Sequence, residues 1–267
     1  MMKKTIYYKR RKKRRTFIKG MLCIALIIPM ILAVLWAKDK ISGKESLAMA
    51  ALTNGKVREV MTNKDRYPKE LLELLENNSE TVDFILDYPE KKDIPPAETV
   101  GDVIQGEIPL LLQWDERWGY AIYGDNMIAV NGCGPTALAM VAAGLTGDPS
   151  ITPYKVAQFA AGAGYYAGDS GTSWSLMTEG ATHFGIYGEE ASLNENDIFS
   201  ALENGHPIIC SMRPGDFTTT GHFIVLTQVE NGKIRVNDPN SRVRSNRLWD
   251  YNTLEYQIDN LWIFTAM

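Results

Sequence analysis

The residues with the clearest potential for covalent chemistry lie in the segment Gly132–Pro135, which reads Gly-Cys-Gly-Pro. A cysteine thiolate is a nucleophile, and the unpaired backbone N–H groups at the start of a helix stabilise it and can donate to an oxyanion. Pro135 suits a first helical turn, and Leu138 and Leu145 then recur at helical spacing. We therefore predict that Cys133 is a nucleophile at the start of a buried helix, left uncovered by its two glycines. An inert cysteine beside a tight turn is the alternative.

A base for this thiol is expected in His222, which opens a β-rich run, and an orienting group in Asp238, which closes the next run. The turn between the runs decides whether the two side chains share a face of the sheet. A three-residue loop over Glu230–Gly232 places Asp238 diagonal to His222 on the same face, whereas a two-residue turn at Asn231-Gly232 places Asn237 there. We predict the three-residue loop, with Asp238 holding the imidazole and Asn237 as the fallback.

A second oxyanion donor is available in Gln113, which follows a short apolar run. Its carboxamide N–H can join the backbone N–H of Cys133 in polarising a substrate carbonyl, as an acyl-transfer site requires. The alternative is a glutamine whose amide is satisfied by nearby backbone. Spacing alone favours the alternative, and Gln113 remains a candidate for the oxyanion hole.

The remaining histidines and the second cysteine of this part of the chain are expected to be structural. His183 lies late in a helical run, His206 lies in a loop, and Cys210 lies among apolar residues in the middle of a strand. Neither histidine belongs to an HExxH motif or shows the His-Cys spacing of a metal site. We therefore predict no metal and no cofactor.

The elements that must position these residues change period along the chain. From Pro153 to about Glu203 the sequence alternates helical runs with loops. The β-rich runs that follow are bounded by turn residues and predict an antiparallel sheet. They comprise residues 207–212, 221–229, 233–237 and 261–264.

The N-terminus has the pattern of a membrane signal-anchor. Ten Lys or Arg and no acid lie between Lys3 and Lys19, and seventeen uninterrupted apolar residues run from Met21 to Ala37. That length is near the lower limit for a span, and the positive-inside rule keeps the basic tail in the cytoplasm. We expect a single-pass cell-membrane protein whose C-terminal domain is extracellular. A signal peptide cleaved near Ala48–Ala50 is the alternative.

The charge of the remainder argues against a nucleic-acid partner. Without the ten basic residues of the tail, 18 Lys and Arg face 32 Asp and Glu. Only Cys133 and Cys210 lie outside the apolar run. A free thiol at Cys133 would therefore leave no intrachain disulfide.

We divide the chain into a basic cytoplasmic tail (1–20), a transmembrane signal-anchor (21–37), a helical juxtamembrane segment with a linker (38–106) and the domain that carries the chemistry (107–267). Within 38–106, leucine stripes and helix-start signals predict two short amphipathic helices around 67–75 and 79–86. These helices need an apolar surface, which the following domain can supply. Simple packing or a membrane spacer is the main interpretation, and a cover over the active-site cleft is the alternative.

The order of cysteine at a helix start, histidine on a strand and Asp or Asn on the next strand resembles the papain-like cysteine peptidases. More narrowly, the chain resembles the bacteriocin-processing peptidases that cut after double-glycine leaders, and their stand-alone C39-like relatives, over about residues 108–264. Four motifs carry the resemblance: Gln113–Trp118, Gly132–Thr136, Gly221–Phe223 and Asn237–Pro239.

This resemblance implies an α+β papain-like fold, with a helical half that packs its buried active-site helix on an antiparallel sheet. It also implies a peptide substrate hydrolysed through a thioester, with Cys133 as nucleophile, His222 as general base and acid, Asp238 as orienter and Gln113 in the oxyanion hole. The best-known members are cytosolic domains fused to an export ATPase, whereas this chain has no Gly-x-x-x-x-Gly-Lys motif, so the substrate is open. A silent surface-binding module and a cell-wall endopeptidase or amidase are the alternatives.

Overall fold

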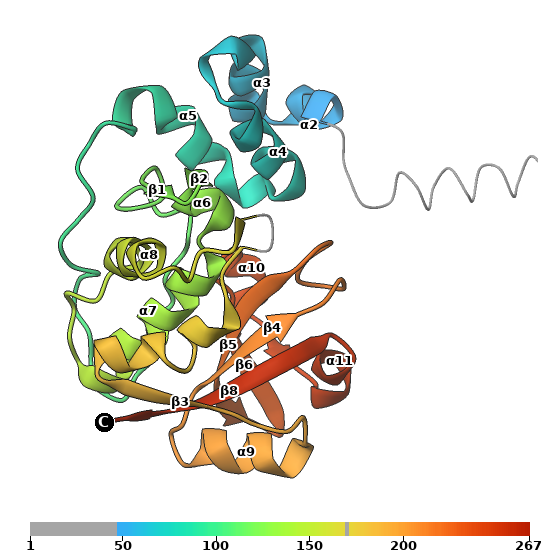
Figure 1. The fold of residues 1–267 in the computed structure, drawn as a ribbon. Coiled ribbons are helices and arrows are strands. Elements are labelled where there is room, and N and C mark those ends of the chain that lie inside the picture. The colour runs from blue at the N-terminus through green and yellow to red at the C-terminus, as the bar shows by residue number, and fades with distance from the viewer. Residues whose placement is uncertain (1–46, 169–170) are drawn as a thin grey trace, which may run out of the picture.

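The computed structural model describes residues 47–168 and 171–267. Helices pack against both faces of a six-stranded antiparallel sheet, and a separate group of helices lies at one end of the molecule (Figure 1). The sequence-based prediction of helices packed on an antiparallel sheet is confirmed in this part of the chain. The domain boundaries inferred from the sequence stay predictions.

The group of helices at the end of the molecule comes from residues 47–91, which we call the helical segment. Its helices are short. The helix over Lys69–Asn77 is amphipathic, and its buried stripe consists of Leu71, Leu74 and Leu75. They pack on Leu112 and Trp114 of the following chain and form an apolar core with them. The helices are α2 (Leu47–Thr53), α3 (Gly55–Thr62), α4 (Lys69–Asn77) and α5 (Val82–Lys91), with 3-10 turns η1 (Lys64–Arg66) and η2 (Ser79–Thr81).

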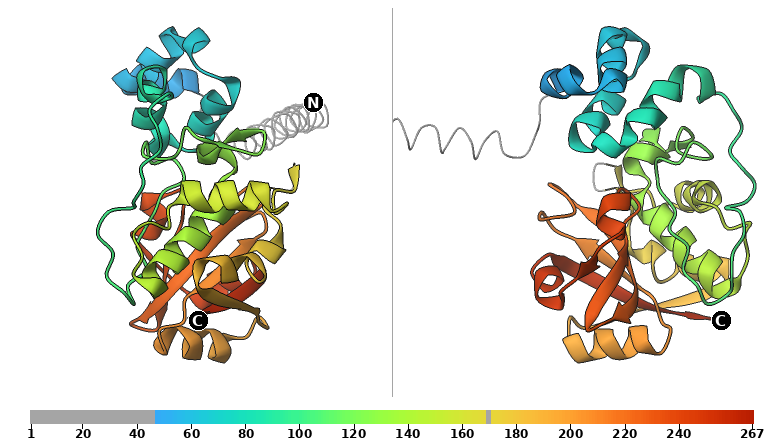
Figure 2. Two further views of the ribbon diagram at one scale, coloured as in Figure 1. Left: turned by 60° about the vertical axis from the view of Figure 1, so that its left-hand side comes forward. Right: turned by 180° about the vertical axis from the view of Figure 1, so that it is seen from behind.

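The helical half of the main body is built around α7 (Cys133–Thr146), which is apolar and buried on nearly all sides. Gly147 ends this helix in the left-handed conformation, with φ of 73°. Around α7 lie a small hairpin and shorter helices, seen beside the sheet in Figure 2. These are β1 (Ile122–Tyr123), β2 (Asn126–Met127), α6 (Ile128–Asn131), α8 (Pro153–Gly162), η4 (Trp174–Leu176) and η5 (Gly180–Phe184).

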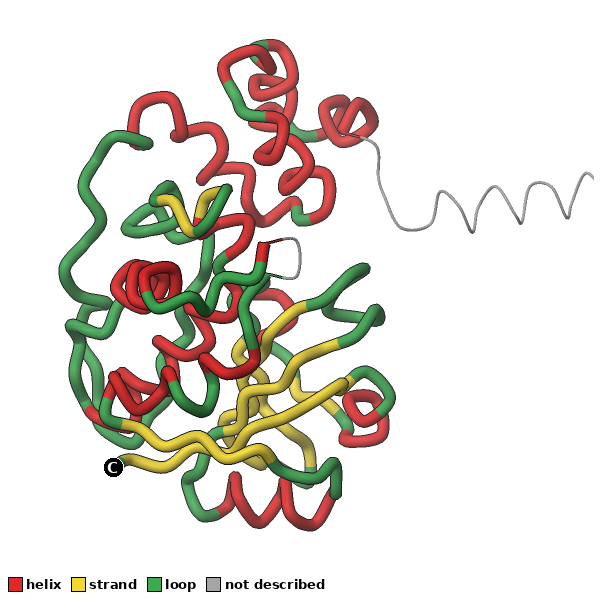
Figure 3. The backbone as a smooth tube through the Cα atoms, in the orientation of Figure 1, coloured by secondary structure: helices red, strands yellow, loops and turns green. Residues whose placement is uncertain are grey.

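The sheet has six strands in the order β3-β8-β4-β5-β6-β7, and every neighbouring pair is antiparallel. Figure 3 shows the strands of this sheet as one group beside the helices. Alternate residues of the central strand face two cores: Phe223 and Val225 pack with α7, whereas Ile224 and Leu226 pack on the other side. The strands are β3 (Ile186–Glu190), β4 (Ile208–Met212), β5 (His222–Glu230), β6 (Lys233–Asn237), β7 (Leu248–Trp249) and β8 (Ile258–Ala266). Helices α9 (Glu195–Glu203), α10 (Arg242–Ser245) and α11 (Tyr251–Glu255) complete the body.

The turn between β5 and β6 corrects one prediction. Strand pairing runs to Glu230 and Lys233, so the turn is the two-residue Asn231-Gly232 and not a three-residue loop. Both turn residues have positive φ, 54° and 74°, as a type I′ turn requires. The prediction failed because Asn-Gly satisfies that turn without help from Glu230.

A β-bulge between Leu226 and Gln228 then shifts the pairing by one residue, so that Val225 faces Asn237 at the far end of the ladder. In this register the position after Asn237 shares a face of the sheet with Ile224 and His222. The predicted placement of Asp238 beside His222 therefore results from a bulge in mid-strand.

The expected localisation is also corrected. None of the helices in residues 47–168 and 171–267 is both long and apolar enough to cross a membrane. The prediction of a membrane-spanning protein is therefore wrong for this part of the chain. The apolar run 21–37, on which that prediction rested, lies outside the described residues.

Candidate active site

The candidate nucleophile Cys133 is the first residue of α7, and its side chain is half-buried. The neighbouring glycines are required by close packing: a Cβ on Gly134 would lie 2.7 Å from the side chain of Thr172, and one on Gly132 would lie 2.5 Å from Ile128. The sequence suggested that these glycines leave the thiol uncovered. In the structure, the absence of a Cβ at these two positions lets Thr172 and Ile128 lie close to the start of α7.

His222 and Asp238 meet as a buried pair. His222 Nε2 lies 2.8 Å from Asp238 Oδ1, and the two side chains are 7% and 0% exposed. His222 opens β5, and Asp238 directly follows β6. Nε2 is held by the carboxylate, so Nδ1 is the ring nitrogen left for the Cys133 thiol, and both side chains line the same two cavities.

The carboxylate of Asp238 is held at both oxygens. Oδ1 also accepts from the backbone N–H of Asn240 at 2.7 Å, and Oδ2 accepts from Arg244 Nε. Burial opposes the charged form, but the positive charges and hydrogen bonds of His222 and Arg244 outweigh it and lower the pKa of Asp238. The group therefore remains a carboxylate that can bond an imidazolium.

Cys133 and His222 shift each other's protonation. Burial opposes the thiolate, but the hydrogen bond and charge of His222, with backbone hydrogen bonds from Phe223 and Gly134, outweigh it and lower the pKa of Cys133. Burial likewise opposes the imidazolium, yet the charge and hydrogen bond of Asp238 and the bond to Cys133 raise the pKa of His222 to about 9. Both shifts favour a thiolate–imidazolium pair over the neutral thiol and imidazole.

Gln113 is buried in the same region, at 3% exposure. Its Nε2 donates to the carbonyl of Ala129 at 2.7 Å, and a second contact with the carbonyl of Val130 is at 3.5 Å. A carboxamide carries two N–H donors, so one of them is only weakly engaged. The side chain lines the same cavity as Cys133 and His222.

Two cavities open beside Cys133 and His222. The larger, of about 770 Å³, extends along the cysteine, the histidine and Gln113 towards α4, whose Glu73 and Leu74 form part of its wall. The smaller, of about 400 Å³, extends past Trp174, which is 44% exposed. The thiol is therefore approachable from two sides.

The residues that the sequence set aside are elsewhere. Cys210 lies in the second core, where burial raises the pKa of its thiol. The ring of His183 stacks on Phe159 with centroids 4.1 Å apart. Asn237, the fallback orienter, donates to the carbonyl of Ile108 at 3.1 Å. In the described residues no group of three His, Cys, Asp or Glu side chains could hold a metal ion.

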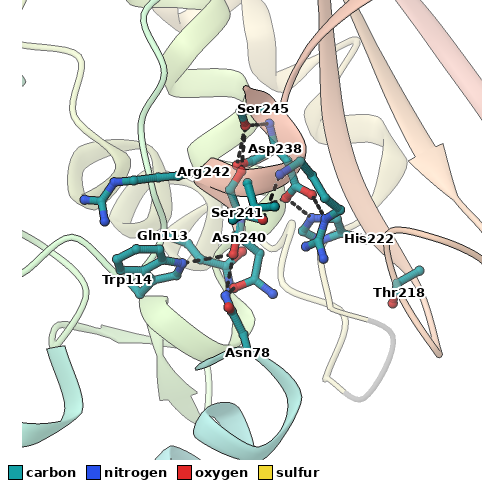
Figure 4. A network of polar contacts seen from close by, with 12 residues as sticks. Asn78, Gln113, Trp114, Thr218, His222, Asp238, Asn240, Ser241, Arg242 and Ser245 are labelled. Atoms are coloured by element: carbon teal, nitrogen blue, oxygen red, sulfur yellow. Dashed lines mark hydrogen bonds and ion pairs between the residues drawn. The ribbon is translucent and has the colours of Figure 1, made fainter. Parts of the chain in front are cut away.

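Arg244 and Glu80 were missed by the sequence reasoning, and Figure 4 shows the polar network around the loop that joins them to Asp238. Arg244 lies six residues after Asp238, in a run with Arg242 and Arg247 that gave only a weak signal. Glu80 is distant in sequence, and no motif connects it with the site.

A model of the Peptidase_C39 like family matches residues 105–265. No protein with a curated description matches the chain.

Three solved structures also match the chain. The peptidase domain of Streptococcus ComA, described as a bi-functional ABC transporter involved in a quorum sensing pathway, is 20% identical, with 51% of this chain and 93% of that one covered and a TM-score of 0.41. A double glycine motif protease from an AMS/PCAT transporter, in complex with the leader peptide, is 12% identical, with 61% and 94% covered and a TM-score of 0.37. A C39-like protein from Bacillus anthracis is 14% identical, with 61% and 96% covered and a TM-score of 0.35.

The resemblance inferred from the four sequence motifs is confirmed by the family match, which spans more than half of the 267 residues. The chain therefore belongs to the Peptidase_C39 like family.

Proposed function

We propose that the protein is a cysteine peptidase that hydrolyses peptide bonds through a thioester on Cys133. The observation that carries this proposal is the buried hydrogen bond between His222 and Asp238, with His222 lining the same two cavities as Cys133. The opposed shifts of the two pKa values supply a thiolate and a proton donor at the same pH.

In the first half of the reaction, the thiolate of Cys133 attacks the carbonyl carbon of the scissile bond. The negative charge moves to the carbonyl oxygen, where the N–H of Gln113 is the proposed donor. When the tetrahedral intermediate collapses, the C–N bond breaks and His222 gives its Nδ1 proton to the departing amine. The products are a thioester and a free amino terminus.

In the second half, neutral His222 takes a proton from water, and the hydroxide oxygen attacks the thioester carbonyl. The C–S bond breaks, the acid product leaves and the thiolate–imidazolium pair is restored. Asp238 holds the ring through Nε2 in both halves, so that Nδ1 faces the thiol. The carboxylate of Asp238 also stabilises each imidazolium that forms.

The proposed substrate is a peptide in an extended conformation. Cavities on two sides of Cys133 offer room for the residues before and after the scissile bond, and the exposed Trp174 supplies an aromatic surface in one of them. The solved double glycine motif protease was determined with a leader peptide. Which side chains the cleft of this chain accepts is what substrate profiling would measure.

The test is cleavage of a mixed peptide library by the purified protein, followed by mass spectrometry. Cys133→Ala and His222→Ala should each lower turnover by at least about a thousandfold, because nucleophile and base act as one unit. Cys210→Ala, which removes a buried thiol from the second core, serves as the matched control and should retain cleavage. Undiminished cleavage by the Cys133→Ala protein would contradict the proposal.

A further inference from the structure

The loop that follows β6, residues 238–244, is the meeting point of three parts of the chain. It carries Asp238, which bonds His222, and Arg244, which bonds Asp238. The carbonyl of Pro239 accepts from the backbone N–H of Gln113 at 2.8 Å, and the carbonyl of Asn240 accepts from Trp114 Nε1 at 3.1 Å. We call residues 238–244 the aspartate loop.

The third part is the helical segment, which contacts this loop through two polar side chains, Asn78 and Glu80, that lie between α4 and α5. Asn78 Nδ2 donates to the carbonyl of Asn240 at 2.5 Å. Glu80 accepts from Ser241 Oγ and from the backbone N–H of Arg242, the latter at 2.9 Å. A carboxylate that receives hydroxyl and backbone donors makes strong charge-assisted hydrogen bonds.

Short connections lead from Glu80 to the catalytic carboxylate. Ser241, which donates to Glu80, accepts through its Oγ from the backbone N–H of Arg244 at 3.1 Å, and its carbonyl accepts from Ser245 Oγ at 2.7 Å. Ser245 Oγ in turn accepts from the backbone N–H of Asp238 at 2.9 Å. Moving Ser241 therefore moves both the backbone of Asp238 and the arginine that bonds its side chain.

The helical segment does not seal the site. Its helix α4 lines the larger cavity with Glu73 and Leu74, while Cys133 and His222 still line that cavity from the other side. The segment thus forms one wall of the cleft and grips the aspartate loop, yet it lies before residue 105, where the family match begins.

From these contacts we infer that Glu80 is a positioning residue of the peptidase, and that the helical segment aligns the site through it instead of covering the site. Glu80 touches neither the thiol nor the imidazole, and it acts through Ser241 and the aspartate loop on Asp238. This inference rests on the proposed function, since it assigns a role within the same Cys133–His222–Asp238 arrangement.

The experiment compares the full chain with Glu80→Ala, Glu80→Asp and Glu80→Gln. Alanine removes both carboxylate oxygens that accept from Ser241 and Arg242. Aspartate keeps the carboxylate but places it one methylene farther from these donors. Glutamine can still accept from the N–H of Arg242 and can donate to Ser241, whose hydroxyl is able to reverse its role. Glu59→Ala is the matched control, because Glu59 is exposed on α3 and its loss changes the net charge equally.

The main readout is the pH dependence of Cys133 alkylation by iodoacetamide, followed by mass spectrometry of the Cys133 peptide. A displaced Asp238 stabilises the imidazolium less, so the alkylation midpoint of Glu80→Ala should rise by about one pH unit. The kcat for a cleaved peptide should fall by about tenfold to a hundredfold, with KM little changed. Glu80→Asp should lie between, and Glu80→Gln and Glu59→Ala should follow the wild type.

Thermal unfolding identifies the variants that remain folded, and Glu80→Asp carries the comparison if the alanine variant does not fold. Loss of stability alone would lower the amplitude of alkylation in the folded state without moving its midpoint. Folded Glu80→Ala and Glu80→Asp proteins with the wild-type midpoint would overturn the inference, as would a Glu80→Gln protein shifted as far as Glu80→Ala. Failure of the wild type to cleave any peptide is a separate result that counts against the proposed function, since the alkylation profiles need no substrate.

Discussion

At the scale of single residues, His222 is where the charges of the site meet. Its ring is held by the carboxylate of Asp238 and lines the same cavities as Cys133, and Arg244 holds the other oxygen of that carboxylate. Each group stabilises the charged form of its neighbour more than burial opposes it. The reactivity proposed for the thiol therefore depends on the negative charge of Asp238, which stabilises the imidazolium of His222.

Two adjacent residues test that dependence. Asp238→Ala should lower kcat/KM by about a hundredfold or more, because His222 loses the partner that fixes its orientation and supports its charge. Asn237→Ala should keep kcat/KM within about threefold of the wild type. It should cost about 1–3 kcal/mol of unfolding free energy, because the carbonyl of Ile108 loses its donor. Equal losses of activity in both variants would mean that Asp238 is not the orienting group.

The pH dependence of peptide cleavage follows from the same pair. As pH rises, kcat/KM should first increase through the lowered pKa of Cys133, as the thiolate forms, and then fall through the pKa of His222 at about 9, as the imidazolium is lost. In Asp238→Ala, the alkaline limb should move to lower pH, since the charge that raises the pKa of His222 has gone. An alkaline limb that stays in place would contradict the assignment.

The sequence was informative at this scale for residues whose type is itself a chemical signal. Cys133, His222 and Asp238 were predicted from residue type and local pattern, and Gln113 through the family resemblance. The structure brings their side chains to a common region. Arg244 and Glu80 were missed because their importance comes from contacts and not from a motif. Their place beside Asp238 depends on how one loop is folded.

At the scale of elements, the ribbon of β5 and β6 decides which side chain meets His222. The Asn231-Gly232 turn by itself would place Asn237 on the face of His222, and the bulge near Thr227 restores that position to Asp238. The turn was misjudged, while the final pairing agreed with the prediction. Hydrophobic alternation and turn residues did not indicate the bulge. Val225 is buried on one face of the sheet and Leu226 on the other, so both faces are apolar here and the alternation carries no signal.

The close packing at the start of α7 can be tested by adding a Cβ at Gly134. Gly134→Ala should destabilise the protein by about 1–3 kcal/mol, since its Cβ would lie 2.7 Å from the side chain of Thr172. Cleavage should weaken as well, because Cys133 is the adjacent residue. Chemical denaturation and kcat/KM measure the two effects.

Gly162→Ala is the control for this substitution. Gly162 ends α8 and has no neighbour within 4 Å of an added Cβ. Its stability should be unchanged or raised by up to about 1 kcal/mol. A Gly134→Ala protein as stable and as active as this control would show that the start of α7 is less tightly packed than described.

At the scale of the whole molecule, the helical segment is joined to the body by an apolar core as well as by polar contacts. Leu71 and Phe84 from the segment pack in one cluster with Leu112 and Trp114, which directly flank Gln113. Leucine periodicity predicted short amphipathic helices that need an apolar surface, and the structure supplies that surface. Sequence patterns could not show that the same helices line the cleft, because that follows only from tertiary packing.

Removal of the helical segment separates an aligning role from a covering role. A chain that begins at Lys92 would expose Leu112, Trp114 and Tyr120 and would lose the contacts to the aspartate loop. Stability should fall by about 3 kcal/mol or more, from the apolar area returned to water, and kcat/KM should fall with it. Calorimetry and peptide cleavage give both values. A truncated chain that is stable and more active than the full protein would favour the covering role.

The most direct test of the whole account is a titration of the thiolate in the folded protein. The ultraviolet absorbance of the wild type, minus that of Cys133→Ala, reports the protonation of this one sulfur. The account predicts that the midpoint lies below the value of about 8.5 of a free cysteine, and that His222→Ala moves it upward towards that value. A wild-type midpoint near that ordinary value, unchanged by His222→Ala, would contradict the paired thiolate and imidazolium on which the proposed function depends.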